Sequence, residues 1–153
     1  MVLYDNLLED FSFDEVRFVV AHELAHVRHR DLPNGLLYLA LVAPFGMLAA
    51  ARLAAALGAR PDARAVAPTA LALAVLVPAI TGISNQLSRA VESRADAFAL
   101  RLTGEPRAQI AFQKRIALAN VGDPDPPGWF HAAFGTHPTT LERIGMAEAA
   151  ARR

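Results

Sequence analysis

Ala21-His22-Glu23-Leu24-Ala25-His26 is the stretch on which the fold of this chain depends, because it places an HExxH pattern inside a segment that reads as a helix from about residue 13 to residue 30. On a helix, residues four apart lie one turn above each other, so His22 and His26 can offer two imidazoles to one metal ion. Glu23 lies beside them, off the apolar stripe. Two neutral nitrogen ligands, an open position for water and a nearby carboxylate are what a zinc hydrolase requires.

A five-residue pattern also arises by chance, and two histidines on a helix can be surface residues or hydrogen-bonded core residues. The helix carries an apolar stripe next to the face with the histidines, and its members are Val16, Val20, Leu24 and Val27. A polar face beside the core stripe needs a partner. The remainder of the chain must therefore supply further ligands if the pattern is a metal site.

Length and composition limit the class of protein. The chain has 153 residues, about one domain, and 54% of them are hydrophobic. Its charge lies mostly outside one central region, which indicates a membrane protein with a polar catalytic part. The net charge of zero gives no indication of nucleic-acid binding, and the lack of cysteine excludes disulfides and thiolate ligands. Any metal ligand must be His, Asp or Glu. No basic stretch followed by an apolar run opens the chain, so no cleaved leader is expected.

Two long uncharged stretches occupy the centre of the chain. Residues 32–51 carry no charge and, after a polar patch, none appears from residue 65 to residue 88. Each stretch can cross about 30 Å of hydrocarbon as a helix, so we predict a transmembrane hairpin with its turn near residues 58–65. The alternative is a pair of helices buried in a globular core. The alanines and three prolines weaken the hydropathy, but proline and small residues are common in membrane helices.

Capping signals and helix breakers set the boundaries around the HExxH helix. Ser12 followed by Glu15 is a capping box that predicts the helix start. The breaker cluster Leu-Pro-Asn-Gly at residues 32–35 predicts that this helix ends near Asp31. Residues 2–4 have the composition of a short strand, which an acidic, apolar connection would join to the helix.

Two further helices and a last one are predicted beyond the hairpin. The pattern predicts one helix over residues 85–102 and another from Pro106 to about residue 121, with proline in its first turn. Thr139 followed by Glu142 is a second capping box, which starts the last helix.

Residues 122–138 separate the last two of these helices and contain the run Asp-Pro-Asp-Pro-Pro-Gly. Proline and glycine at this density predict a loop without regular structure, of a length that is often functional. Its aromatic residues Trp129, Phe130 and Phe134 are expected to pin the loop to the body or to line a substrate groove.

A catalytic zinc ion usually has three protein ligands plus water, so a third ligand must be found. Glu92 and Asp96 are the candidates, because a carboxylate on a facing helix can bind metal while an acid one turn on hydrogen-bonds a ligand histidine. An ExxxD pattern alone is usually a solvated helix face. His29 can compete as a ligand, but three ligands on one short helical stretch give poor tetrahedral geometry. His131 has no supporting neighbours and is expected to be structural.

Three blocks of sequence resemble the signatures of a known family. They are His22-Glu23-Leu24-Ala25-His26, residues 88–98 (Ser-Arg-Ala-Val-Glu-Ser-Arg-Ala-Asp-Ala-Phe) and residues 137–144 (His-Pro-Thr-Thr-Leu-Glu-Arg-Ile). They look like the blocks of the integral-membrane zinc metallopeptidases that include the CAAX prenyl endopeptidases and the HtpX heat-shock proteases. The blocks stand in the same order, with a hairpin between the first two, and the resemblance covers nearly the whole chain.

The resemblance implies a role for each matching residue. His22 and His26 would be ligands of one zinc ion per chain, with Glu92 as the third ligand. Glu23 would be the general base that activates the water and passes its proton to the leaving amine.

The same resemblance implies supporting residues around the metal. Asp96 would orient a ligand histidine. Asn85 lies above Glu92 on the same predicted helix, and from that position it is expected to line the site. His137 and Arg143 match family positions that contact the substrate carbonyl or the developing oxyanion. For Arg143 a salt bridge is the alternative.

The expected fold is mainly α, a helical zinc-peptidase domain with a two-helix transmembrane hairpin inserted between the HExxH and ExxxD helices. The single domain, residues 1–153, would divide into 1–31 (strand remnant and HExxH helix), 32–84 (hairpin) and 85–153. The resemblance implies further membrane helices and a fuller β-strand ahead of this chain's start. The chain is therefore expected to be a fragment, a gene model with a late start or a minimal relative.

The expected function is membrane-embedded, zinc-dependent hydrolysis of peptide bonds in membrane or misfolded proteins. One alternative is a catalytically inactive or truncated membrane scaffold that keeps the zinc site, and another is a soluble helical domain with a structural metal. The expected partners are a peptide or protein substrate and the lipid bilayer, not nucleic acid. Arginines are more numerous on the site side of the hairpin than near its turn, so we expect a plasma (inner) membrane protein whose site faces the cytoplasm.

Overall fold

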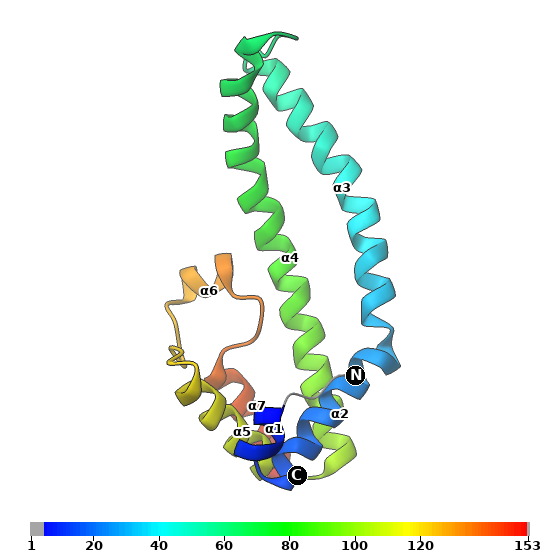
Figure 1. Ribbon diagram of the computed structural model, residues 1–153, viewed down its shortest axis with the longest axis vertical. Coiled ribbons are helices and arrows are strands. Elements are labelled where there is room, and N and C mark those ends of the chain that lie inside the picture. Colours follow the sequence, from blue (N-terminus) through cyan, green and yellow to red (C-terminus); the bar gives the residue numbers. More distant parts are fainter. Residues whose placement is uncertain (1–4, 153) are drawn as a thin grey trace.

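The computed structural model describes residues 5–152, and within this range every regular element is a helix. The elements are α1 (Asp5–Asp10), α2 (Phe13–His29), α3 (Asp31–Ala56), the 3-10 helix η1 (Ala63–Ala65), α4 (Val66–Thr103), α5 (Pro106–Ala119), α6 (Gly128–Phe134) and α7 (Thr140–Ala151). The mainly α fold is confirmed. The predicted strand at residues 2–4 lies outside the described residues. Figure 1 shows α3 and α4 as a long hairpin that rises from a base formed by α1, α2, α5 and α7.

Both capping boxes form as predicted and fix the starts of α2 and α7. The Ser12 hydroxyl accepts from the Glu15 amide, and the Glu15 carboxylate accepts from the Ser12 amide. The same reciprocal pair joins Thr139 and Glu142. Each box satisfies two amides at a helix start that have no partner within the helix.

The junction between α2 and α3 differs from the prediction. Arg30 takes the left-handed conformation (φ 57°), and α3 begins at the next residue, Asp31, so the breaker cluster lies inside a helix. Pro33 is tolerated there because it falls in the first turn, where its missing N–H would have no helical partner. The chain therefore changes direction at one residue, and Asp31 stays next to the end of α2.

The hairpin has long apolar helices with little buried surface. α3 has 26 residues and α4 has 38, and both are long and apolar enough to cross a membrane. Within the described chain, Ala54 is the only buried residue of α3, and Ala72 is the only one in α4 before Asn85. A helix in a soluble core would bury its large side chains, so the alternative of two buried core helices does not fit.

Three other boundaries also differ from the prediction. α4 runs without interruption through residue 85, where a new helix was expected. The connection at residues 5–10 is the short helix α1, and α6 lies within the predicted loop. Between Gly128 and Gly135 there are six residues, none of them proline or glycine, and this interval permits a short helix.

The core at the base consists mostly of small residues contributed by four helices. Its members are Phe18 and Ala21 of α2, Ala99 and Leu100 of α4, Ala108 of α5 and Ala147 of α7. Alanine at these contacts allows helix axes to approach closely. Close approach brings the polar face of α2 against that of α4.

Candidate metal centre

His22 and His26 point the same ring nitrogen toward one position. Their Nε2 atoms are 3.2 Å apart. Two Zn–N bonds of about 2.0–2.1 Å at a tetrahedral angle would separate the nitrogens by about 3.3 Å. The histidine pair therefore has the spacing that a tetrahedral metal site needs.

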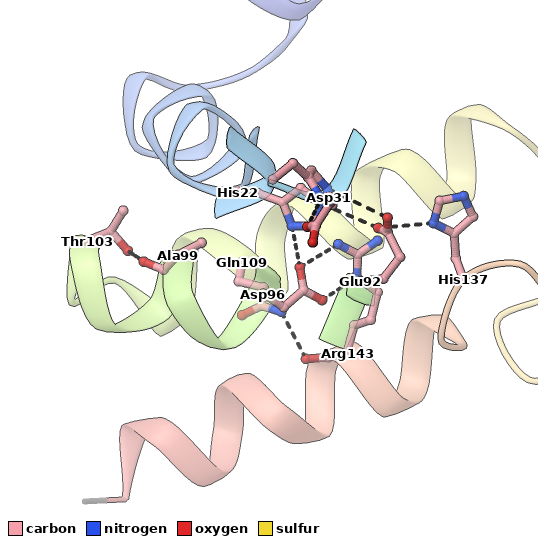
Figure 2. Close-up of polar contacts among 10 residues, drawn as sticks. His22, Asp31, Glu92, Asp96, Ala99, Thr103, Gln109, His137 and Arg143 are labelled. Atoms are coloured by element: carbon pink, nitrogen blue, oxygen red, sulfur yellow. Dashed lines mark hydrogen bonds and ion pairs between the residues drawn. The ribbon is translucent and has the colours of Figure 1, made fainter. Parts of the chain in front are cut away.

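Glu92 of α4 faces the two histidines and completes a three-residue cluster. One of its carboxylate oxygens is 3.4 Å from His22 Nε2 and the other is 3.7 Å from His26 Nε2. Its side chain is 14% exposed. Figure 2 shows this carboxylate between His22 and His137, with Asp96 one turn further along the same helix. The structure thus brings together the three residues expected as ligands from two distant parts of the chain.

Glu23 is a second carboxylate near the histidine pair. Its carboxylate lies within 4.8 Å of the histidine nitrogens, so His22, Glu23 and His26 could also hold a metal ion. Glu23 is exposed to solvent, whereas Glu92 is nearer and mostly buried. The two carboxylates differ in environment, since that of Glu92 is fixed between the histidines and that of Glu23 is exposed to water.

A cavity of about 280 Å³ opens over this cluster. The polar residues that line it are His22, Glu23, His26, Glu92, His137 and Arg143, and the apolar ones are Phe18, Val19 and Phe112. The cavity joins residues of α2, α4, α5 and α7 with the segment before α7. It offers a small substrate group access to both carboxylates.

Asp96 fixes the orientation of His22. It is completely buried, and its Oδ1 accepts from His22 Nδ1 at 2.8 Å. Arg143 donates to both oxygens of the same carboxylate, through Nε at 2.7 Å and Nη2 at 2.6 Å. Because a carboxylate only accepts hydrogen bonds, the Nδ1 proton of His22 is fixed, and Nε2 is the atom that faces His26 and Glu92.

Asp31 orients His26 as Asp96 orients His22, a role that was not predicted from the sequence. Asp31 Oδ2 accepts from His26 Nδ1 at 2.9 Å, and its other oxygen accepts from Arg94. From the sequence, Asp31 was expected only to mark the end of the HExxH helix. The signal that could have revealed it is a carboxylate five residues after the second histidine, just beyond the turn at Arg30.

The charges of the cluster shift one another's pKa values. Burial alone would lower the pKa of His22, but hydrogen bonds to Asp96 and Glu92 outweigh it and raise the pKa to about 9. For Glu92, burial would raise the pKa, yet hydrogen bonds from His137 and His22 lower it well below its ordinary range. Burial is likewise outweighed at Asp96, where His22 and Arg143 lower the pKa. Both carboxylates are therefore ionised and ready to face a cation.

The remaining candidate residues lie at different distances from the cluster. His137 is at the cavity, with Nδ1 at 3.1 Å from a Glu92 oxygen and with its side chain 61% exposed. Arg143 lines the cavity but forms the ion pair with Asp96 that was its alternative reading. Asn85 is not brought to the cavity, because its side-chain amide donates to the Ala133 carbonyl at 2.8 Å.

Neither of the other two histidines joins the cluster. The ring of His29 packs edge-on against Phe98 at 5.7 Å between ring centroids. His131 Nε2 donates to the His137 carbonyl at 2.8 Å, which is a structural contact of the kind expected. The donor set that could hold a metal is therefore two imidazoles and one carboxylate, each supported by a hydrogen bond, and this composition suits zinc.

Comparisons with known proteins agree with this geometry. The family model for Peptidase family M48 matches residues 1–151. The uncharacterized metalloprotease YhfN of Bacillus subtilis (strain 168) is 29% identical to the chain over 158 residues, which cover 97% of the chain and 37% of YhfN. A protease HtpX homolog of Burkholderia multivorans is 34% identical over 168 residues, covering 95% of the chain and 58% of that homolog.

A solved structure shares the fold. The crystal structure of S. mikatae Ste24p matches with a TM-score of 0.78 and 21% sequence identity, over 94% of this chain and 37% of Ste24p. The chain thus spans 37% to 58% of the length of the two curated relatives. The resemblance seen in the three sequence blocks is confirmed by these matches, and the chain belongs to peptidase family M48.

Proposed function

We propose that this chain is a membrane-embedded, zinc-dependent endopeptidase that hydrolyses peptide bonds in membrane or misfolded proteins. The observation that carries the proposal is the convergence of His22 Nε2, His26 Nε2 and the Glu92 carboxylate within 3.2–3.7 Å of one another. These distances match the edges of a tetrahedral zinc site. A cluster held together only by ion pairs would not need two histidines whose other nitrogens are both bound to carboxylates.

His22, His26 and Glu92 would hold one zinc ion per chain. Zinc bound there would act as a Lewis acid that polarises a substrate carbonyl and lowers the pKa of water. Glu23 is the proposed general base, because its exposed carboxylate reaches the same cavity without being fixed between the histidines. It would take a proton from the attacking water as the C–O bond forms, and return it to the amine nitrogen as the C–N bond breaks.

His137 and Arg143 are proposed to stabilise the negative charge that develops on the carbonyl oxygen. The His137 imidazole stands at the cavity beside Glu92, so it can donate to a bound carbonyl group. Arg143 adds positive charge at the cavity wall while it holds Asp96 in place. Asp96 and Asp31 keep the two histidines in the required orientation.

The hairpin is proposed to span a lipid bilayer with the site on the cytoplasmic side. Its exposed apolar side chains need a hydrocarbon environment, and they include Leu36, Phe45, Met47, Leu71 and Val75. Arginines on the site side include Arg17, Arg28, Arg30, Arg89, Arg94, Arg101 and Arg107, and they outnumber Arg52, Arg60 and Arg64 near the turn. An excess of arginine marks the cytoplasmic side of a membrane protein.

Metal analysis of the detergent-purified protein tests the proposed site. We expect about one zinc per chain in the wild type, and loss of that zinc in both His26→Ala and Glu92→Ala. Glu23→Gln should keep the zinc and lose proteolysis of an unfolded protein substrate. Zinc retained at wild-type affinity by Glu92→Ala would contradict the ligand assignment.

The same variants separate the peptidase from an inactive scaffold. The scaffold remains a candidate because the chain covers only 37% to 58% of the two curated relatives. A scaffold would bind zinc in the wild type and in Glu23→Gln alike, and neither protein would cleave the substrate.

A further inference from the structure

α6 carries a group of aromatic side chains that are exposed although they pack against each other. The rings of Trp129 and Phe130 are 5.8 Å apart between centroids, and those of Phe130 and Phe134 are 5.1 Å apart. Their exposed fractions are 74% for Trp129, 46% for Phe130 and 62% for Phe134. Three adjacent aromatic side chains left open to solvent indicate a surface that something else covers.

The aromatic side chains are not what holds α6 in place, contrary to the expectation that they pin this segment to the body. α6 is held to α4 through its backbone, because Asn85 donates to the Ala133 carbonyl at 2.8 Å. Arg89 donates to the carbonyls of His131, at 3.1 Å, and of Gly135. Two polar side chains of α4 thus fix the helix, and the described residues leave its aromatic surface largely exposed.

The level along α4 at which α6 is held indicates what covers this aromatic surface. Asn85 lies near the end of the uncharged stretch of residues 65–88, and Arg89 is the first charge after it. At the same level of the other hairpin helix, the Tyr38 hydroxyl hydrogen-bonds Ser84 at 3.0 Å. Figure 1 shows α6 beside the middle of α4, above α5 and α7. The aromatic residues therefore lie where the apolar surface of the hairpin gives way to the charged base.

We propose that Trp129, Phe130 and Phe134 of α6 insert into the interfacial layer of a phospholipid bilayer on the site side. This inference rests on the membrane placement proposed for the hairpin. Tryptophan is enriched at this depth, where its ring lies among the headgroups and its N–H remains hydrated. The exposed apolar surface of α4 reaches down to Ile83 and Leu87, so the aromatic surface of α6 continues it at the same level.

Insertion would also fix the segment that carries His137. His131, within α6, donates to the His137 carbonyl at 2.8 Å, and Arg89 binds the carbonyl of Gly135 between them. His137 in turn contacts Glu92 at the cavity. α6 therefore sets the edge of the cavity relative to the membrane surface, where a peptide segment leaving the bilayer would meet it.

Trp129 is the only tryptophan in the chain, so its fluorescence reports on α6 without a mutation. The full chain is reconstituted in phosphatidylcholine–phosphatidylglycerol vesicles that contain lipids brominated near the headgroup or near the bilayer centre. We expect emission shifted to shorter wavelength, and stronger quenching by the shallow bromines than by the deep ones. Aqueous iodide should quench weakly.

Two reference variants calibrate the depth, each built on Trp129→Phe. Val75→Trp places the probe on an exposed position in the apolar part of α4, and Leu118→Trp places it on an exposed position of α5. Deep bromines should quench the first variant most strongly, and iodide should quench the second. Trp129 is expected to lie between the two references.

The inference is overturned if brominated lipid quenches the probe in Val75→Trp but does not quench Trp129. This conclusion is the same whether iodide reaches Trp129 or a protein surface shields it. In that case the hairpin placement stands and only the role of α6 fails. If lipid bromines quench neither probe, the membrane placement in the proposed function fails together with this inference.

Discussion

His26 depends on a residue that belongs to the next helix. The carboxylate of Asp31, the first residue of α3, accepts from His26 Nδ1 at 2.9 Å and is itself paired with Arg94 of α4. Carboxylates in this position hold a ligand imidazole in one tautomer and increase its basicity. The second imidazole is therefore oriented from outside the HExxH motif.

We predict that Asp31→Asn weakens zinc binding by about 10–100-fold, because the amide loses the charge that orients and polarises His26. Competition with a chromophoric chelator would measure the affinity. Asp14→Asn is the matched control, since Asp14 is an exposed carboxylate in the first turn of α2 and should leave the affinity unchanged. Equal affinities for the two variants would show that Asp31 has no part in the site.

The raised pKa of His22 predicts that zinc binding releases a proton. In the metal-free protein this pKa is about 9, so at pH 7.5 the ring carries a proton on Nε2, the atom that faces the metal. Zinc must displace that proton, so its apparent affinity should rise by about tenfold per pH unit up to pH 9 and then level off. Calorimetry at pH 7.5 in buffers of different ionisation enthalpy should show about one proton released from His22. Identical heats in all buffers would contradict the assignment.

At the scale of elements, the site depends on how closely α2 and α4 approach. Ala21 of α2, next to His22, and Ala99 of α4, one turn after Asp96, both belong to the buried core, and Ala99 is completely buried. We predict that Ala99→Leu destabilises the base by about 1–3 kcal/mol, because the added carbons cannot be accommodated without moving the helices. Zinc affinity should fall as well, since the proposed ligands come from both helices.

Thermal unfolding in detergent, followed by circular dichroism, would measure the stability change, and chelator competition would measure zinc affinity. Ala90→Leu is the control, because Ala90 is an exposed residue of the same helix. A loss of stability in Ala99→Leu with unchanged zinc affinity would show that the approach of the two helices does not limit metal binding.

Features with a strong local signal could be predicted, whereas those with a weak signal or set by distant partners could not. The capping boxes at Ser12 and Thr139 form between residues three apart, so the sequence alone located both helix starts. The long uncharged stretches likewise showed the hairpin. The sharp turn at Arg30 was missed because it uses a left-handed arginine, where glycine or asparagine is the usual signal.

In the candidate site, too, some residues could be predicted from the sequence and others could not. HExxH and ExxxD spacing placed His22, His26 and Glu92 on two helices, and the structure brings them together. Asp31 could not be identified as a partner of His26 without knowing that α3 starts immediately after the turn. For Asn85, helical periodicity gave a face of α4 but not its neighbour, and the neighbour is the α6 backbone rather than the cavity.

At the scale of the whole molecule, one continuous helix joins the far turn of the hairpin to the candidate metal centre. Because α4 is a single helix through Asn85 and Glu92, these residues are about 10 Å apart along its axis at 1.5 Å per residue. The cavity, which Glu92 lines, is therefore held at a fixed, short distance from the end of the apolar stretch. In the proposed topology, a peptidase site in this place would act on chain segments at the membrane surface without entering the hydrocarbon.

The proposed topology predicts that the two ends of the molecule face opposite sides of the membrane. The chain contains no cysteine, so single cysteines can be introduced without a background. Ala63→Cys marks the turn, in η1, and Ala111→Cys marks an exposed position of α5 at the base. In intact bacterial cells, a membrane-impermeant maleimide should label Ala63→Cys, and it should label Ala111→Cys only after the membrane is opened. The reverse pattern would place the site outside the cytoplasm, against the arginine distribution, and labelling of both in intact cells would show that the hairpin does not separate two compartments.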